Sequence, residues 1–241
     1  MSLSKRKKER NETTELQASQ GYGKTFGLNM KSSKFDSLIF DLDGTLWNTP
    51  EICARAWTFA LAGRGISRNV AESEVAGLMG LNAEEIRQAL FPALTVDEGK
   101  SLLQDCLDQE IVFIEREPAR LYPGVLDGMH RLAEDYPICL VSNCDESYMQ
   151  AFLKVSGIAD LVIDWECYGR TQKSKGENLL NVLDRNKLTA SLYVGDTEGD
   201  RKAARFARST FIYAAYGFGK ASEFDESFSD FSVFVDWVIG Q

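Results

Sequence analysis

Short apolar runs alternate with longer amphipathic stretches over most of the chain. Five apolar runs predict buried strands, near residues 35–40, 138–142, 161–163, 191–195 and 210–214. Elsewhere apolar residues recur at the spacing of one helix face, near residues 125–134, 146–156, 175–185, 199–208 and 231–239. Apolar strands that alternate with amphipathic helices predict a mostly parallel sheet with helices on both faces, which is an α/β fold.

Residues 49–120 depart from this alternation. They predict four consecutive helices, near residues 50–62, 70–78, 82–90 and 96–115. In the last of these, Leu102, Leu103 and Cys106 share one face, with acidic residues on the other. The stretch contains no strand pattern, which predicts an all-helical insertion between the first strand and Pro123.

The composition is that of an ordinary globular protein, with 44% hydrophobic and 26% charged residues in a chain of 241. No apolar run approaches the ~18 residues of a membrane span, and no apolar signal-peptide region follows the start, so we expect a cytoplasmic protein. The five cysteines are scattered without a C-x-x-C pair, which favours reduced thiols over disulfides or a zinc site. His130 is the single histidine, which disfavours a serine–histidine–aspartate triad and a multi-histidine metal site.

The net charge of −9 is unevenly distributed. Residues 1–31 carry seven Lys and Arg against three Glu, whereas the rest of the chain carries 20 against 33, a net charge of −13. Such an acidic body disfavours nucleic acid as a partner. We interpret residues 1–31 as a disordered basic extension, with a binding tail or sequence ahead of a true start at Met30 as alternatives. Removal of residues 1–29 is expected to change neither activity nor melting temperature.

The first predicted strand ends in the segment FDLDGTL at residues 40–46. A carboxylate at the carboxyl end of a strand points into the crevice where open α/β sheets bind ligands. Asp41 is placed to attack phosphorus and form an aspartyl-phosphate, and Asp43 to protonate the leaving oxygen and then activate water. Gly44 permits a sharp turn, and Thr45 offers its hydroxyl and its amide N–H to phosphate oxygens. Taken alone, the segment is more typical of a solvated acidic turn.

Three later segments supply the other groups of a phosphoryl-transfer site. They are a strand that ends in Ser142 and Asn143, a basic turn with two lysines at 171–178, and a strand that ends in Asp196 with Asp200 four residues later. Together with Asp41 they provide a nucleophile, a hydroxyl group, a cation and an acidic metal site. Phosphoryl transfer needs these parts because its catalysis is mostly positioning and neutralisation of charge.

In this order the segments resemble the haloacid dehalogenase-like superfamily of aspartate-nucleophile phosphohydrolases. The match consists of D-x-D-G-T-L at 41–46, the strand end at 142, the lysine turn at 171–176 and G-D-x-x-x-D at 195–200. YPGV at 122–125 and YGFG at 216–219 resemble segments of its phosphoglycolate-phosphatase-like branch. The resemblance implies a Rossmann-like catalytic core formed by residues 32–48 and 121–241. Residues 49–120 would then be an inserted helical cap that closes over the site.

The resemblance also implies a magnesium site. The Asp41 carboxylate, the Asp43 backbone carbonyl and Asp196 are expected to hold Mg²⁺, with water and a phosphate oxygen completing the coordination. Two carboxylates ~4 Å apart repel by about 4 kcal/mol at an effective dielectric near 20, and a dication relieves that repulsion. Asp200 supports the metal through water, orients the lysine, or is simply an acidic residue at a helix N-terminus.

Two lysines compete for the cationic role. We favour Lys175 over Lys173, because Lys-Gly-Glu-Asn begins a helix and resembles an S-K-G variant of the family's turn. Ser142 is expected to bind phosphate beside the amide that follows it. Asn143 contacts the substrate or caps the next turn, and the sequence leaves both roles open.

We therefore expect a Mg²⁺-dependent phosphatase that hydrolyses a small phosphorylated metabolite through an aspartyl-phosphate. The alternatives are a phosphotransferase or sugar-phosphate mutase with the same chemistry, and a silent binding protein on the same scaffold. Mutases of the β-phosphoglucomutase type have a lysine before, and an arginine three residues after, the cap glycine that Gly80 resembles. Met79 and Ala83 stand at those positions here, which disfavours a mutase. Asn82 and Arg87, the nearest polar residues, are expected to influence the choice of substrate. We expect no nucleic acid or membrane partner, and the substrate and oligomeric state stay open.

Overall fold

The computed structural model describes residues 34–117 and 120–241, so the prediction for residues 1–31 lies outside the described residues. At its centre is a six-stranded sheet in which all neighbouring strands are parallel. In spatial order the strands are β5 (Val162–Cys167), β4 (Ile138–Ser142), β1 (Ser37–Phe40), β6 (Ser191–Gly195), β7 (Thr210–Ala214) and β8 (Glu226–Phe228). The predicted α/β fold is confirmed, and β1 lies between β4 and β6.

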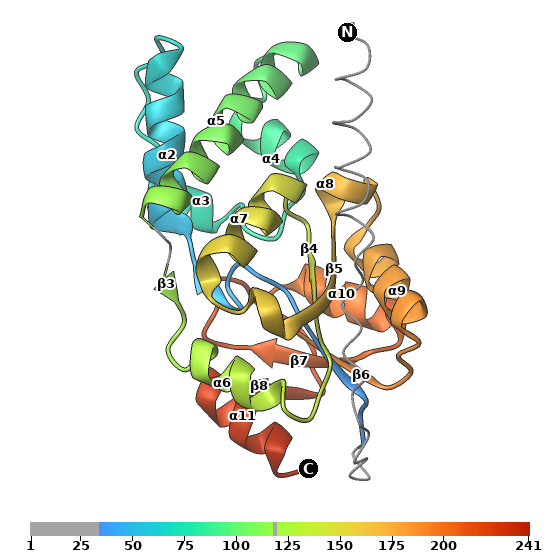
Figure 1. The fold of residues 1–241 in the computed structure, drawn as a ribbon. Helices are drawn as coiled ribbons and strands as arrows, with labels where there is room; N and C mark the ends of the chain where they lie inside the picture. The colour runs from blue at the N-terminus through green and yellow to red at the C-terminus, as the bar shows by residue number, and fades with distance from the viewer. Residues whose placement is uncertain (1–33, 118–119) are drawn as a thin grey trace, which may run out of the picture. The chain divides into compact units, whose positions relative to one another are not determined.

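Helices cover both faces of the sheet, because successive residues of a strand point to opposite sides. Ile39 of β1 lies in one apolar cluster with residues of α9 (Lys175–Asn186) and α10 (Glu198–Ala207). Its neighbours Leu38 and Phe40 lie in a second cluster with residues of α6 (Val125–Leu132), α7 (Glu146–Ser156) and α11 (Phe231–Ile239). Figure 1 shows α9 and α10 on one side of the sheet and α6 and α11 on the other.

A helical segment interrupts the chain between two short strands. β2 (Trp47–Asn48) and β3 (Arg120–Leu121) pair as an antiparallel ladder. Between them lie α2 (Pro50–Gly63), α3 (Glu72–Ala76), α4 (Ala83–Leu90) and α5 (Val96–Arg116), grouped in the upper part of Figure 1. Capping boxes begin α4 at Asn82 and α5 at Thr95. The described part of this segment contains no strand, whereas the division of the chain into a core and a cap domain stays a prediction.

Two strands differ from their predicted extent. β5 runs to Cys167, well beyond residue 163, and is preceded by a 3-10 turn (Ala159–Leu161) and followed by α8 (Tyr168–Thr171). Asp164 and Glu166 interrupt its apolar pattern, and both accept hydrogen bonds from Arg185 of α9. β8 was not predicted, because its three residues contain no apolar run. Both are edge strands, where charged residues are tolerated.

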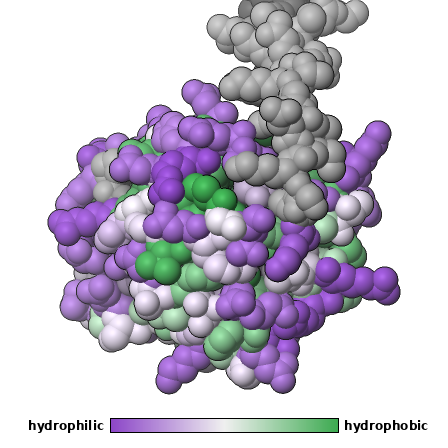
Figure 2. All heavy atoms as spheres, turned by 90° about the horizontal axis from the view of Figure 1, so that it is seen from below, coloured by the Kyte–Doolittle hydropathy of each residue, from purple (hydrophilic) through white to green (hydrophobic). Residues whose placement is uncertain are grey.

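The surface offers no large apolar region on the face shown in Figure 2, where hydrophilic residues predominate and apolar residues form small groups. Exposed large apolar side chains of the described residues include Phe59, Phe206 and Val233, which lie on three different helices. Scattered apolar residues of this kind are ordinary. Within the described residues, none of the helices combines the length and the apolar character needed to cross a membrane.

Candidate active site

Three adjacent strand ends bring the candidate residues together. β4 and β6 flank β1, so Ser142, Asp41 and Asp196, which end or directly follow these strands, meet at one edge of the sheet. Asp41 donates its backbone N–H to the Val194 carbonyl at 2.9 Å, and the residue is 2% exposed. The chain then turns at Gly44, which has a φ of 78°.

Asp41, Asp196 and Asp200 form a buried acidic cluster. One carboxylate oxygen of each lies within 4.8 Å of the others. Oδ2 of Asp196 accepts the backbone N–H groups of Phe218 and Gly219 at 2.8 and 2.9 Å. Its Oδ1 is buried and has no hydrogen-bond partner among the described residues. An unpartnered carboxylate oxygen beside two further carboxylates fits a hard dication such as Mg²⁺.

Two glycines make room for Asp196. A Cβ atom at Gly44 would stand 2.2 Å from Asp196 Oδ2, and one at Gly217 would stand 2.4 Å from Asp196 Cβ. The turn after β1 and the loop at 216–219 therefore close on the same carboxylate. From the sequence, Gly44 was expected only to permit a turn.

Lys175 supplies positive charge inside this cluster. Its Nζ atom lies 3.0 Å from Asp41 Oδ1 and 2.7 Å from Asp200 Oδ1, and the residue is 6% exposed. Burial lowers the pKa of Lys175, but the carboxylates of Asp200 and Asp41 outweigh burial and raise it above its usual value. Lys173 is exposed. Of the two candidate lysines, the structure places Lys175 beside Asp41.

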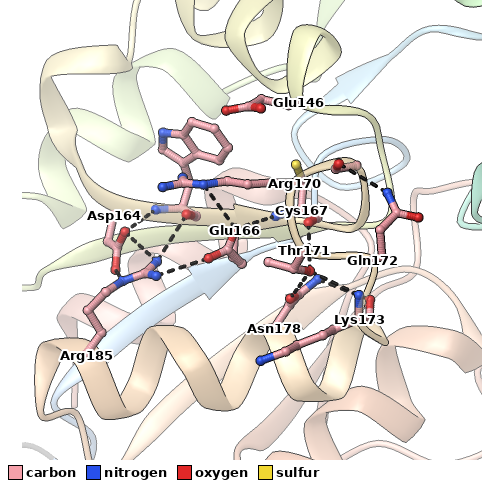
Figure 3. Close-up of polar contacts among 12 residues, drawn as sticks. Glu146, Asp164, Glu166, Cys167, Arg170, Thr171, Gln172, Lys173, Asn178 and Arg185 are labelled. Carbon is pink, nitrogen blue, oxygen red and sulfur yellow. Dashed lines mark hydrogen bonds and ion pairs between the residues drawn. The ribbon is translucent and has the colours of Figure 1, made fainter. Parts of the chain in front are cut away.

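The turn that carries both lysines is held by the hydrogen bonds drawn in Figure 3. The Thr171 hydroxyl donates to Asn178 Oδ1 at 2.7 Å, and Asn178 Nδ2 donates to the Lys173 carbonyl at 3.3 Å. Ser174 forms a capping box with the third residue of α9. Because Lys175 is the first residue of this capped helix, its backbone position is fixed.

Both carboxylate oxygens of Asp200 are engaged. Oδ1 accepts from Lys175 Nζ and from the Tyr193 hydroxyl at 3.0 Å, and Oδ2 accepts the Thr197 N–H at 2.9 Å in the capping box that begins α10. Burial raises the pKa of Asp200, but Lys175 outweighs burial and holds it below its usual value. Asp200 thus lies at a helix N-terminus and also contacts the lysine. Support of a metal through water stays a prediction.

The cluster is short of positive charge. Burial raises the pKa of Asp41 well above its usual value; Lys175 offsets part of the rise, and the carboxylates of Asp200 and Asp196 add to it. Burial and then Asp200 raise the pKa of Asp196 to about 7. Three carboxylates share one ammonium group, and this deficit is the physical reason to expect a cation.

Asp43 is held by two hydroxyl groups. Its Oδ1 accepts from the hydroxyls of Thr49 and Tyr148, each at 2.6 Å. Burial raises the pKa of Asp43, and these hydroxyls hold it down in part. A fixed carboxyl group with a raised pKa is suited to proton transfer. Sequence reasoning missed Thr49 and Tyr148, because the first directly precedes a helix and the second lies on the buried face of another.

The residues predicted to bind substrate have different surroundings. Ser142 is 4% exposed and lines the cavity described below. Asn143 donates Nδ2 to the Gly80 carbonyl at 2.8 Å, which links β4 to the helical insertion, a role not among the two weighed. Thr45 donates its N–H to the Leu42 carbonyl at 3.1 Å, within the turn, and the expected contact of this N–H with phosphate stays a prediction. The Thr45 hydroxyl is buried without a partner among the described residues, and Thr45 does not line the cavity, so its contact with a phosphate oxygen stays a prediction.

A cavity of about 70 Å³ extends from Asp41 and Asp43 into the helical insertion. The insertion lines it with Trp57, Val75, Leu78, Met79, Ile86 and Glu110. Asn82 and Arg87, expected to influence the choice of substrate, are not among its lining residues. Asn82 caps α4, and Arg87 pairs with Glu84 at 2.6 Å, so both polar groups are engaged within the insertion.

Comparison with known proteins identifies a family and similar folds. A model of the haloacid dehalogenase-like hydrolase family matches residues 38–214. A phosphoglycolate phosphatase from Aliivibrio fischeri is 29% identical over 206 residues, which are 80% of this chain and 89% of that protein. The structure of a predicted phosphoglycolate phosphatase from Haemophilus somnus has a TM-score of 0.76 at 26% identity, over 88% of this chain and 100% of that one. A haloacid dehalogenase-like family protein from Streptococcus pneumoniae has a TM-score of 0.72 at 19% identity, over 85% of this chain and 98% of that one.

Proposed function

The chain belongs to the haloacid dehalogenase-like hydrolase family and is a phosphatase of that family; on this basis we propose that it uses Mg²⁺ and an aspartyl-phosphate to hydrolyse a small phosphorylated metabolite. The observation that carries the proposal is the buried contact of Lys175 with Asp41, 3.0 Å apart, beside the unpartnered oxygen of Asp196. A nucleophile, a fixed cation and an acidic metal site then occupy one edge of the sheet.

In the first step a carboxylate oxygen of Asp41 attacks phosphorus, and the bond from phosphorus to the leaving oxygen breaks. The proton of Asp43 passes to that oxygen, so the alcohol leaves uncharged. Lys175 holds Asp41 in place, while the hydroxyls of Ser142 and Thr45 donate to the phosphoryl oxygens. These contacts offset the charge that the phosphoryl group carries in the transition state.

In the second step Asp43, now a carboxylate, takes a proton from water. The water oxygen attacks phosphorus, and the bond from phosphorus to Asp41 breaks. Inorganic phosphate leaves, Asp41 is again a carboxylate, and Asp43 is again protonated. Thr49 and Tyr148 hold one oxygen of Asp43 throughout, which leaves the other for the proton.

Asp41, Asp196 and the backbone carbonyl of Asp43 would hold Mg²⁺, with Asp200 positioned to support it. Bound there, the ion would neutralise charge on the phosphate oxygens. Residues 49–120 would act as a cap that excludes water from the site and contacts the leaving group. The hydrogen bond from Asn143 to Gly80 supports this role, because it joins the end of β4 to the insertion.

Phosphate release from p-nitrophenyl phosphate tests the proposal. We expect release to require Mg²⁺ and to stop on chelation. Asp41→Asn should lower kcat by several orders of magnitude, because an amide does not attack phosphorus, whereas the exposed Asp127→Asn on α6 should not. Retention of more than about a tenth of wild-type activity, a barrier change of only ~1.4 kcal/mol, would refute the covalent mechanism.

The alternatives give different products. A mutase must hold a second phosphate, but Met79 and Ala83 line the cavity where a mutase of the β-phosphoglucomutase type has basic residues. A phosphotransferase would form a new phosphate ester in place of inorganic phosphate. A silent binding protein would release no phosphate.

A further inference from the structure

The end of the cavity that the helical insertion lines is mostly apolar. Its walls are built by Val75, Leu78, Met79 and Ile86 of the helical insertion. The cavity volume of about 70 Å³ is below the ~150 Å³ of an apolar cavity that holds benzene. This volume favours a compact leaving group.

Basic side chains are absent from the cavity lining within residues 34–117 and 120–241; the acidic residues that line it are Asp41, Asp43, Glu110 and Asp145. Three arginines of the insertion are engaged in ion pairs outside the cavity lining. Arg64, Arg68 and Arg87 form ion pairs with Asp105, Glu74 and Glu84, respectively. Burial of an anion needs a paired cation, so this end of the cavity disfavours a second anionic group on the substrate.

Two polar groups interrupt the apolar wall. Trp57 is 2% exposed, and its indole Nε1 has no hydrogen-bond partner among the described residues. Glu110 of α5 is 4% exposed. Burial and then Asp43 raise the pKa of Glu110 to about 8, and a protonated carboxyl group can both donate and accept a hydrogen bond. The side chains of Trp57 and Cys53 lie close enough to Glu110 to hold that pKa down in part. A buried indole donor beside a buried carboxyl group suits a hydroxyl group of the ligand.

We propose that the substrate is the phosphate monoester of a small uncharged alcohol, with a second hydroxyl group that meets Trp57 and Glu110. The inference rests on the proposed function, since the alcohol is the leaving group of that reaction. It excludes phosphorylated carboxylic acids as preferred substrates, and phosphoglycolate is among these. The named substrate of the relatives therefore does not carry over to this chain.

Four phosphate esters with the same two-carbon skeleton test the proposal on the wild-type chain with Mg²⁺. They are 2-hydroxyethyl phosphate, ethyl phosphate, phosphoglycolate and 2-aminoethyl phosphate. We expect kcat/KM for 2-hydroxyethyl phosphate to exceed that for ethyl phosphate and for phosphoglycolate by about tenfold or more, because a site built to hydrogen-bond a hydroxyl rejects analogues that lack it. Glu110→Gln and Trp57→Phe should each lower the hydroxyethyl-to-ethyl ratio. Glu115→Gln, an exposed change on the same helix, should leave that ratio unchanged.

Each other outcome has a definite meaning. Preference for phosphoglycolate overturns the inference but leaves the phosphatase function intact. Preference for 2-aminoethyl phosphate also overturns it, because the ligand would then be a cation. If neither Glu110→Gln nor Trp57→Phe changes the hydroxyethyl-to-ethyl ratio, the second hydroxyl of the substrate does not meet these residues, and the inference is overturned. Absence of turnover with these esters and with p-nitrophenyl phosphate refutes the proposed function, and the inference with it.

Discussion

Replacing Lys175 with methionine should destabilise the fold and abolish activity. Its Nζ atom lies 3.0 Å from Asp41 and 2.7 Å from Asp200. At an effective dielectric of about 20, each contact corresponds to roughly 5–6 kcal/mol of Coulomb attraction before desolvation is counted. Burial of the charges cancels most of this attraction, but removal of one partner leaves the others uncompensated. Such a loss typically costs about 3–5 kcal/mol, which is the decrease we expect in the free energy of unfolding.

Urea unfolding in the presence of EDTA measures this decrease without help from a metal. Lys173→Met is the matched control, because Lys173 lies in the same turn and is exposed; its effect should stay within about 0.5 kcal/mol. Asp200→Asn should restore part of the stability of Lys175→Met, since it removes one of the uncompensated charges. Added Mg²⁺ should also restore part of it.

The same variants separate the two lysines in catalysis. Turnover of p-nitrophenyl phosphate should fall by about 100-fold or more in Lys175→Met, because a fixed charge beside the phosphoryl group is lost, and should change little in Lys173→Met. A destabilisation below about 1 kcal/mol in EDTA would show that Lys175 does not balance the cluster. If Lys175→Met and Lys173→Met lower turnover equally, the position of Lys175 beside Asp41 does not account for its effect on catalysis.

Three further predictions concern the metal site and the fold. Titration calorimetry should show that Asp196→Ala weakens Mg²⁺ binding more than Asp200→Ala, because both oxygens of Asp200 already accept protein donors; the reverse order would exchange their roles. Gly44→Ala and Gly65→Ala should each cost about 1 kcal/mol of unfolding free energy for their positive φ. Only Gly44→Ala should abolish turnover, because its methyl group would stand 2.2 Å from Asp196 Oδ2, whereas nothing lies within 4 Å of a methyl group at Gly65. Equal activities of the two variants would contradict this prediction. Asp36 accepts the backbone N–H groups of Thr189 and Ala190 at 2.7 and 3.0 Å and the hydroxyl groups of Ser37 and Thr189. Burial raises the pKa of Asp36, but these four hydrogen bonds outweigh burial and hold it below 3.8. Asp36→Asn should therefore cost about 1 kcal/mol near neutral pH, and the difference should disappear as the pH falls below the lowered pKa; a constant difference down to about pH 2 would refute it.

The strand ends could be predicted from the sequence because each is a local feature. Asp41, Ser142 and Asp196 stand where an apolar run stops, and a parallel sheet brings such positions to one edge regardless of the chain between them. The partners of Asp43 could not be predicted in this way. Tyr148 lies on the apolar face of an amphipathic helix, and only the packing of that helix against Trp47 of β2 turns its hydroxyl toward Asp43.

The edge strands were harder to predict than the central ones. A central strand is buried on both faces and therefore has a continuous apolar run. β5 carries Asp164 and Glu166, whose charges are balanced by Arg185 from a helix some twenty residues later. The apolar pattern of β5 alone does not show that Arg185 will pair with these two carboxylates. The same limit applies to Glu110, which on sequence alone is one more acidic residue of an amphipathic helix.

Charge balance and, in the proposed function, substrate choice depend on different parts of the described chain. Lys175 and the carboxylates around it all come from the sheet and the helices that cover it, so the charge balance at Asp41 does not depend on α2–α5. The insertion adds an apolar wall, with Trp57 and Glu110 as its buried polar groups. In the proposed function, a substitution in that wall alters which leaving group fits and leaves Lys175 and the carboxylates around Asp41 in place. Under the proposed function, the insertion is therefore the part of the chain in which substitutions should change the preferred metabolite.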